Sequence, residues 1–453
     1  CLKKIDAVIV DDYRFFNIWE ELVYSLNCKI IVLDDQDKNN HHCNLLIDST
    51  WEGKKTFDRY NGKISNNTKL LLGAKYLLID EEFNFNKKKE KQFLKKNKPI
   101  KILLSLGGGG DLLFLVPLIK SLIKQLYKDY FVEISVVIGP FAINQSKFLD
   151  FAKKNNLIKV IINKDGLFDE ISQTNLYIGS SGGTLFEALS LKKPCITFSI
   201  SENQQNKHSN FEELGHYFHL NNISKSDLPN FASLVIEILL KYDKVFDLYQ
   251  KSSPYEIDGK GVSRVGNAIH QVIIDESKFE PKLMSYEDTR REVGYELSQI
   301  NDNSINRYID ARNLKINLDK MVDKDPIPRI NHYLWWLKSN IRTSYVLKKN
   351  GKELLFIWHQ ENQILNKNII TSGWFVSDKS CTALDAMQAI TEHSKILDKL
   401  FQGYYWIVIM RLDNKFMKQL HRRLKFNIVE KGGEMEDIVK ASFPKANAND
   451  FLY

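Results

Sequence analysis

The sequence has few cysteines and no long apolar run. Its five cysteines are scattered among 453 residues without C-x-x-C spacing, which argues against a disulfide framework or a zinc site and favours reduced thiols in a cytoplasm. The longest apolar stretch, LLFLVPLI at residues 112–119, is far shorter than the ~20 residues that a membrane-spanning helix needs. We therefore expect a cytoplasmic protein with no membrane span.

Basic residues are numerous but are not gathered into a stripe. The formal net charge is +8, and the one dense lysine cluster, at residues 86–99, is typical of a solvated linker. A nucleic-acid-binding face would interleave basic residues with aromatics, so we expect no nucleic-acid partner. His41, His42 and Cys43 are adjacent, but consecutive side chains diverge on a strand, and we expect no metal site.

Short apolar runs divide the first part of the chain into two predicted α/β domains. Residues 1–98 predict a partial Rossmann-like domain and a linker, and the strand-like run AVIV already begins at Ala7. Because the chain starts with Cys1 rather than Met, we expect a fragment whose opening strands are missing. Residues 99–276 alternate apolar strands with helical segments, which predicts a parallel, doubly wound sheet. The predicted strands here are 101–106, 133–139, 159–163, 175–180 and 195–200, and the predicted helices are near 111–128, 144–155, 167–173 and 203–214.

The pattern of apolar and polar residues changes from about residue 280, and residues 280–453 predict a separate α+β domain. Residues 304–340 are typical of helices, and the segment 345–360 predicts a hairpin that turns at Asn350 and Gly351. Further strands are expected at 370–378 and 404–412, with one helix near 381–400 and another that ends near Arg423.

Two glycine-rich turns each follow a predicted strand and open a predicted helix. Such turns present free N–H groups and the positive end of a helix to an anion, commonly a diphosphate. Neither turn matches G-x-G-x-x-G or a P-loop, and either one alone could be a tight connection. Two of them at the carboxyl ends of strands in one sheet favour a nucleotide-binding crevice. The turns contain Gly107, Gly108, Gly109, Gly110 and Asp111, and Ser181, Gly182, Gly183 and Thr184.

Glu187 has two interpretations. Thr184 and Glu187 have the S/T-x-x-E spacing of a capping box, in which each side chain satisfies a backbone N–H at the helix start. The same carboxylate, one turn into the helix, could instead accept two hydrogen bonds from a ribose diol. After the following strand, Asn203 and Gln204 supply amides where a sugar would project from the diphosphate.

Several stretches in one order resemble a known family. They are similar to the nucleotide-sugar signature of GT-B enzymes, in particular the UDP-sugar hydrolases of pseudaminic acid biosynthesis. The resemblance covers roughly residues 5–275 and is carried by DDYRFFNIWEELV at 11–23, SLGGGGD at 105–111, GGTLFEALSLKKPCITFSISENQQN at 182–206 and DGKGVSRV at 258–265.

The resemblance implies a UDP-sugar bound between two Rossmann-like domains. It implies that water cleaves the sugar–UDP bond of a UDP-diacetamido-trideoxyhexose, in nonulosonic (pseudaminic or sialic-acid-like) sugar biosynthesis, with no metal or other cofactor. It also implies active-site roles for Tyr13 and Asn203 and a ribose-binding role for Glu187.

The chain departs from the family pattern at one catalytic position. The family opens with a G-x-G-H turn whose histidine is a candidate catalyst, and this sequence has none, since Gly215 and His216 follow Glu213 and Leu214. We therefore expect slow hydrolysis. Two alternatives stay open: a glycosyltransferase that uses the same UDP site with a sugar or lipid acceptor, and a non-catalytic nucleotide-sugar binding protein.

The stretches at residues 307–339, 345–360 (YVLKKNGKELLFIWHQ) and 412–430 (LDNKFMKQLHRRLKFNIVE) resemble the GNAT acetyltransferases, most closely the sugar-nucleotide N-acetyltransferase that acts one step before that hydrolase. This resemblance covers roughly residues 300–430. The resemblance implies acetyl-CoA as a possible cofactor, with its pyrophosphate on a Q/R-x-x-G-x-G/A loop. Here that loop comprises Lys379, Ser380, Cys381 and Thr382, and two of these stand where glycines belong. Because a Cβ hinders close approach of the backbone, we expect weak acetyl-CoA binding, and a relic domain is the alternative to acetyl transfer.

His421 is the candidate general acid of this domain. It stands where many GNATs place the tyrosine that protonates the leaving thiolate, and an imidazolium can do the same chemistry. An ordinary surface histidine on a helix face is the other interpretation.

Overall fold

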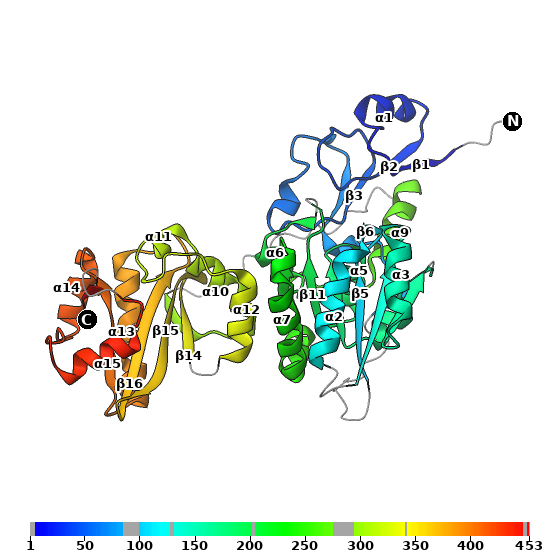
Figure 1. Cartoon of the computed structure of the whole chain (residues 1–453). Coiled ribbons are helices and arrows are strands. Elements are labelled where there is room, and N and C mark those ends of the chain that lie inside the picture. Colours follow the sequence, from blue (N-terminus) through cyan, green and yellow to red (C-terminus); the bar gives the residue numbers. More distant parts are fainter. Residues whose placement is uncertain are drawn as a thin grey trace. The chain divides into compact units, whose positions relative to one another are not determined.

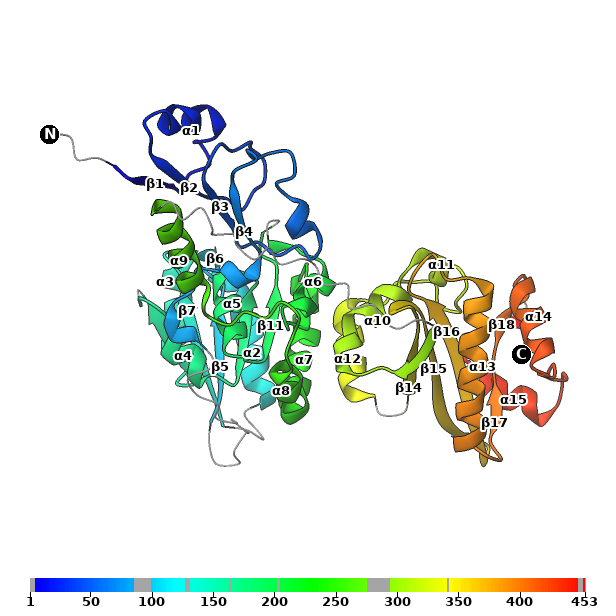
Figure 2. The same cartoon turned by 180° about the vertical axis from the view of Figure 1, so that it is seen from behind.

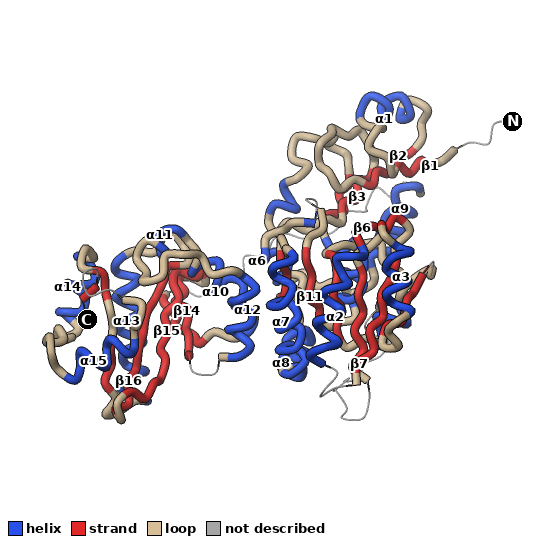
Figure 3. The backbone as a smooth tube through the Cα atoms, viewed as in Figure 1, coloured by secondary structure: helices blue, strands red, loops and turns tan. Residues whose placement is uncertain are grey.

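The chain folds as two compact units, Cys1–Glu287 and Asp288–Tyr453. The computed structural model describes residues 5–84, 99–126, 131–162, 164–201, 204–274, 294–339, 342–446 and 451–452. The first unit holds two parallel sheets and the second a mostly antiparallel sheet (Figure 3), so the predicted fold class is confirmed. Within the described residues, no helix has both the length and the apolar composition that crossing a bilayer requires.

The first sheet has four parallel strands in sequential order. Their apolar residues form the core, and helix α1 (Asn17–Tyr24) follows the first strand (Figure 1). The apolar run at 76–79 forms no strand, because a 3-10 turn, Ala74–Tyr76, ends the layer there. The strands are β1 (Ala7–Val10), β2 (Lys29–Leu33), β3 (Leu45–Asp48) and β4 (Lys69–Leu72).

The second sheet has six parallel strands in the order β12-β11-β10-β5-β7-β9. Strands β5, β7 and β9 follow one another toward one edge of the sheet. Strands β10, β11 and β12 then follow one another toward the opposite edge, so the order reverses between β5 and β10. This is the doubly wound topology, whose ligands bind outside the carboxyl ends of the strands at the reversal. The strands are β5 (Ile100–Ser105), β7 (Val132–Ile138), β9 (Ile158–Ile162), β10 (Leu176–Ser180), β11 (Cys195–Phe198) and β12 (Phe218–Leu220).

Helices pack on both faces of the second sheet (Figures 1 and 2). Right-handed crossovers place the helices that follow β5 and β7 on one face and the helix that follows β10 on the other. Two helices begin later than the sequence predicts, at Leu115 and His208. The helices are α2 (Leu115–Leu126), α3 (Gln145–Lys153), α4 (Phe168–Gln173), α5 (Gly183–Ser190), α6 (His208–Glu213), α7 (Leu228–Leu240) and α8 (Tyr242–Gln250).

Helix α9 (Gly261–Ile273) crosses back from the second sheet and packs on the first. Its apolar residues Val265, Ala268 and Val272 join the core of the first sheet. The DGKG stretch makes the crossing possible, because a Cβ on Gly261 would lie 1.9 Å from the Leu77 carbonyl oxygen. Only a glycine backbone can approach so closely.

The second unit is a five-stranded sheet flanked by helices. Its neighbours pair antiparallel except β16 and β17, which pair in parallel. The predicted hairpin is confirmed, and Asn350 and Gly351 have the positive φ values, 51° and 76°, that its tight turn requires. The strands are β13 (Tyr295–Gln299), β14 (Arg342–Lys349), β15 (Lys352–Ile364), β16 (Lys367–Val376) and β17 (Tyr405–Ile407), and the helices are α10 (Ile305–Arg312), α11 (Lys315–Leu318), α12 (Arg329–Lys338), α13 (Ala383–Leu400), α14 (Lys415–Arg423) and α15 (Glu434–Ser442).

The last predicted strand is shorter than expected. Of residues 404–412, only Tyr405–Ile407 join the sheet, while Met410–Arg411 form a separate short strand, β18, which pairs with β19 (Phe451–Leu452). The chain leaves the sheet after Ile407, so the apolar run alone overestimated the length of the strand.

Candidate functional site

Three loops meet at the carboxyl edge of the second sheet, where the strand order reverses. The two glycine-rich turns leave the adjacent strands β5 and β10, and a Cβ on Gly107 would lie 3.2 Å from Oγ of Ser180. The loop that follows β11 joins them, because a Cβ on Gly110 would lie 3.6 Å from Cδ1 of Ile200. The residues that the sequence singled out in these loops are therefore neighbours in space.

The first glycine-rich turn contains a short strand that the sequence did not predict. Instead of opening a helix directly, Gly109–Asp111 form a short strand, β6, that pairs in parallel with β8 (Phe141–Ile143). The Asp111 carboxylate accepts hydrogen bonds from the Leu113 N–H at 2.9 Å and from Nδ2 of Asn144 at 2.8 Å. Asp111 thus caps the short helix after it, and Gly107 and Gly110 supply the positive φ values, 76° and 106°.

The second glycine-rich turn leaves a helix N-terminus open. Helix α5 begins at Gly183, and its N-cap is Gly182, which supplies no side-chain cap. The capping box predicted for Thr184 and Glu187 is therefore absent, because the helix starts two residues too early for Thr184 to be the cap. The Leu185 N–H donates to the Gly182 carbonyl at 3.0 Å, but no acceptor for the N–H groups of Gly183 and Thr184 is found among the described residues. A Cβ on Gly183 would meet no atom within 4 Å.

Glu187 lies one turn into α5, on the same helix face as Gly183. Its side chain is half-buried, and no hydrogen bond or ion pair of its carboxylate is found among the described residues. Burial raises the pKa of Glu187, and the charge of Asp80 adds to the effect. A desolvated carboxylate without a partner is energetically costly, and a ligand hydroxyl would relieve that cost.

Gln204 stabilises the third loop, which follows β11, through hydrogen bonds within it. Its Oε1 accepts a hydrogen bond from the Ile200 N–H at 3.2 Å, and its carbonyl accepts from the hydroxyls of Ser181 at 3.0 Å and Ser199 at 3.1 Å. Ser181 thereby links the second turn to this loop. Because its Oε1 already accepts a hydrogen bond within the loop, Gln204 can contact a ligand only through its side-chain NH₂. Asn203 lies outside the described residues.

Tyr13 belongs to the first sheet. It follows β1, is 50% exposed, and its hydroxyl donates to Oδ1 of Asp35 at 2.8 Å. The hydrogen bond to the Asp35 carboxylate raises the pKa of the Tyr13 phenol. Its described hydrogen bonds are to Asp35 and Asn39, and none joins it to the glycine-rich turns among the described residues.

A buried ionic network that the sequence did not reveal lies beneath Tyr13. His41 Nδ1 is 2.8 Å from Oε1 of Glu20, and its Nε2 is 3.5 Å from Oδ2 of Asp34. All three side chains are buried. Burial disfavours the charged ring, but hydrogen bonds to Asp34 and Glu20 raise the pKa of His41 to about 9. The protonated ring therefore bridges Glu20 of α1 and Asp34, in the loop that also carries Asp35.

The network continues at the end of β3. The buried Tyr60 hydroxyl lies 3.0 Å from Oδ2 of Asp34 and 3.0 Å from Oδ2 of Asp48. Nε of Arg59 lies 2.9 Å from the same Asp48 carboxylate. The visible sequence signal was an aspartate at the end of the first three apolar runs, at Asp11, Asp34 and Asp48, since the carboxyl ends of parallel strands meet at one edge of a sheet.

Contacts within the first unit bring this edge to the loop after β11. The Trp51 carbonyl accepts from Nδ2 of Asn206 at 2.8 Å, and Nε1 of Trp51 donates to Oε2 of Glu213 at 3.2 Å. Asp80, which perturbs Glu187, also belongs to the first sheet's side of the unit. Residues that follow β3 and β4 therefore lie beside the loop after β11 and beside α5.

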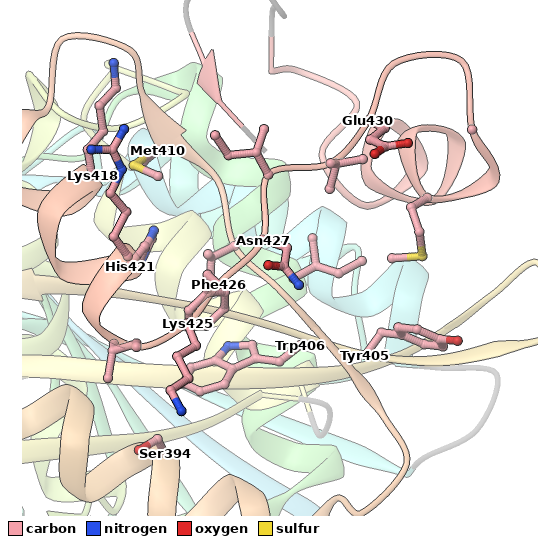
Figure 4. Close-up of a pocket in the computed structure, with 18 of the residues that line it drawn as sticks. Ser394, Tyr405, Trp406, Met410, Lys418, His421, Lys425, Phe426, Asn427 and Glu430 are labelled. Atoms are coloured by element: carbon pink, nitrogen blue, oxygen red, sulfur yellow. The ribbon is translucent and has the colours of Figure 1, made fainter.

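The sequence-predicted residues of the second unit lie in two places. Lys379, Ser380, Cys381 and Thr382 form the loop between β16 and α13. His421 lies on α14 and lines a cavity of about 1120 Å³ together with Trp406 and Phe426 (Figure 4).

His421 is not a surface residue, because it is only 6% exposed. Its ring packs on Phe426 with 5.0 Å between centroids, and no hydrogen-bond partner of Nδ1 is found among the described residues. Burial lowers the pKa of His421. The ring is therefore neutral at pH 7, which weakens the case for a proton donor.

The fold and the three converging loops define a doubly wound α/β protein whose glycine-rich turns meet at the reversal of strand order. No family model matches the chain. The uncharacterized protein MJ1062 of Methanocaldococcus jannaschii is 26% identical over 353 residues, which are 76% of this chain and 65% of that protein. The chain thus spans less than two thirds of that relative's length.

A second relative has a described activity. The UDP-2,4-diacetamido-2,4,6-trideoxy-beta-L-altropyranose hydrolase of Campylobacter jejuni is 26% identical over 206 residues, 45% of this chain and 69% of that protein. The chain is therefore weakly homologous to a UDP-sugar hydrolase.

Two solved structures resemble parts of the chain. A UDP-N-acetylglucosamine 2-epimerase covers 63% of this chain and 76% of its own, at 13% identity and a TM-score of 0.42. An acetyltransferase of the GNAT family from Streptococcus pneumoniae covers 31% of this chain and 93% of its own, at 12% identity and a TM-score of 0.26. The fold class rests on the strand orders given above, since likenesses at this level carry no further weight.

Proposed function

We propose that the first unit is a nucleotide-sugar enzyme that binds a UDP-sugar at the carboxyl edge of the second sheet. The observation that carries this proposal is the meeting of the two glycine-rich turns beside the unpartnered Glu187 carboxylate. The open N-terminus of α5 would hold the diphosphate. Glu187 would accept hydrogen bonds from the ribose diol one turn further along the helix.

The reaction proposed is hydrolysis of the bond between the sugar and UDP. The weak homology to the Campylobacter jejuni hydrolase supports this choice, and suggests a UDP-diacetamido-trideoxyhexose as substrate. Gln204 and Asn203 would face the sugar, and Tyr13 would reach the reacting centre from the first sheet. No G-x-G-H turn occurs in the sequence, and a general base contributes ~10²–10⁴-fold to a rate, so we expect slow turnover.

Incubation with a panel of UDP-sugars, with and without sugar or lipid acceptors, tests this function. Release of UDP without an acceptor, measured by anion-exchange chromatography, supports hydrolysis. Release only with an acceptor would replace the hydrolase with a glycosyltransferase. Binding without turnover would favour a nucleotide-sugar binding protein, the alternative to which the missing G-x-G-H turn points. Failure to bind any uridine nucleotide would refute the proposal as a whole.

A further inference from the structure

The resemblance of the second unit to GNAT acetyltransferases implies that the loop before α13 receives the pyrophosphate of coenzyme A. A helix N-terminus can hold such an anion only if its N–H groups are free to point at it. In this chain the N–H groups of three consecutive residues of the loop before α13 already have acceptors. The Ser380 N–H donates to Oδ1 of Asp378 at 2.7 Å, and the Thr382 N–H donates to Oδ2 of Asp385 at 2.7 Å. Between them, the Cys381 N–H donates to the Asp378 carbonyl at 3.1 Å.

Asp385 is held in place from three sides. The carboxylate is 1% exposed, and it accepts hydrogen bonds from the hydroxyls of Tyr295 and Thr382, each at 2.6 Å. Nζ of Lys349 lies 3.1 Å from its Oδ1. Burial disfavours the charge, but the hydrogen bonds from Thr382 and Tyr295 hold the pKa of Asp385 well below its usual range. The carboxylate is therefore anionic at neutral pH and is tied to β13 and β14.

Asp378 is anchored at the other end of the loop. Its Oδ1 lies 2.9 Å from Nζ of Lys352, which also lies 3.0 Å from Oγ of Ser380. Hydrogen bonds from Ser380 lower the pKa of Asp378 to about 2. Two carboxylates thus occupy the amides of one short loop.

We infer that the N-terminus of α13 is closed to the pyrophosphate of coenzyme A by the chain's own carboxylates, Asp378 and Asp385. These residues do not fit the cofactor, because its phosphates would have to displace two carboxylates that already hold the Ser380 and Thr382 N–H groups and are paired with Lys352 and Lys349. Like charges brought together at a binding site are strongly unfavourable. On this account charge closes the loop, and the side chains of Lys379 and Cys381 contribute less.

Calorimetric titration of acetyl-CoA into the full chain tests the inference. We expect no binding of the unchanged protein below about 1 mM. Asp378→Asn with Asp385→Asn keeps the side-chain shape and one acceptor oxygen at each position and removes both charges, and should raise the affinity by ~10-fold or more. Lys379→Gly with Cys381→Gly keeps both charges and should raise it much less. Asp398→Asn, an exposed aspartate on the same helix, is the matched control and should change nothing.

Low-micromolar binding by the unchanged protein would overturn the inference. So would an affinity that rises with the two glycines and not with the two asparagines. If thermal unfolding shows that the double variant does not fold, Asp378→Asn alone decides the question, because it leaves the buried Asp385 cluster intact. That variant should still bind acetyl-CoA more tightly than the unchanged protein, and an unchanged affinity would refute the role of charge. None of these readouts depends on the UDP-sugar proposal for the first unit.

Discussion

Gly179 of β10 and Ser105 of β5 are register partners in the parallel pair at the centre of the second sheet. A Cβ on Gly179 would lie 1.9 Å from the carbonyl oxygen of Ser105. Because of this close pairing, the two strands end at the same level of the sheet. The glycine-rich turns that follow them therefore lie side by side. The position of the candidate site therefore depends on the missing side chain of Gly179.

Gly179→Ala should lower both stability and ligand affinity. The added methyl must push the two strands apart, and overpacking of this kind costs ~1–3 kcal/mol. We expect a lower melting temperature and weaker UDP binding in calorimetry. Gly183→Ala is the matched control for folding, because its methyl would meet no atom within 4 Å. It should melt at the same temperature or higher, yet bind UDP more weakly, since the methyl stands over the open helix end. Equal behaviour of the two variants would contradict this placement of the ligand.

The buried His41 predicts how stability depends on pH. The folded-state pKa of about 9 lies above the ~6.5 of an unfolded histidine. Its stabilisation is therefore fully present below about pH 6.5 and is lost as the pH rises through 9, a change on the order of 3 kcal/mol. We expect the melting temperature of the first unit to decrease as the pH rises from 6.5 to 9. The His41→Gln variant should lose most of that decrease.

The exposed His270 of α9 provides the control for this pH dependence. His270→Gln should leave the pH profile of the melting temperature unchanged. If both variants keep the same profile as the unchanged protein, the charge on His41 does not stabilise the first unit.

Tyr60→Phe should destabilise the first unit more than a typical loss of one hydrogen bond. The hydroxyl lies between the carboxylates of Asp34 and Asp48, so its removal leaves two buried acceptors poorly satisfied. A buried group without its partner costs ~1–3 kcal/mol, and more when charged. Tyr242→Phe is the control, because that hydroxyl donates to a single neutral acceptor, the Asn175 carbonyl, at 3.2 Å. Equal decreases in melting temperature would mean that the two carboxylates do not depend on Tyr60.

The sheets were predictable because their strands are buried on both faces and appear as continuous apolar runs. The run that became β10 and the run that became β5 both give this signal. Short strands without a pattern were not predictable. Gly109–Asp111 pairs with Phe141–Ile143 only because the fold places these two loops together.

The turns of the candidate site could be located in the sequence, but their contacts could not. The S/T-x-x-E spacing at Thr184 failed as a capping box because Gly182 already starts the helix. The same rule, extended to aspartate, holds at Thr382 and Asp385, where the box does form, and this signal was in the sequence. The clamp of His41 between Glu20 and Asp34 joins residues distant along the chain, so no local pattern could reveal it.

The most direct test of the UDP-sugar account compares two ligands on one variant, Glu187→Ala, by calorimetry. The account predicts a large loss of affinity for UDP and little change for inorganic diphosphate, because the carboxylate addresses the ribose while the α5 N-terminus holds the phosphates. An equal loss for both ligands, or no loss for UDP, would contradict the assignment of Glu187 and with it the proposed site.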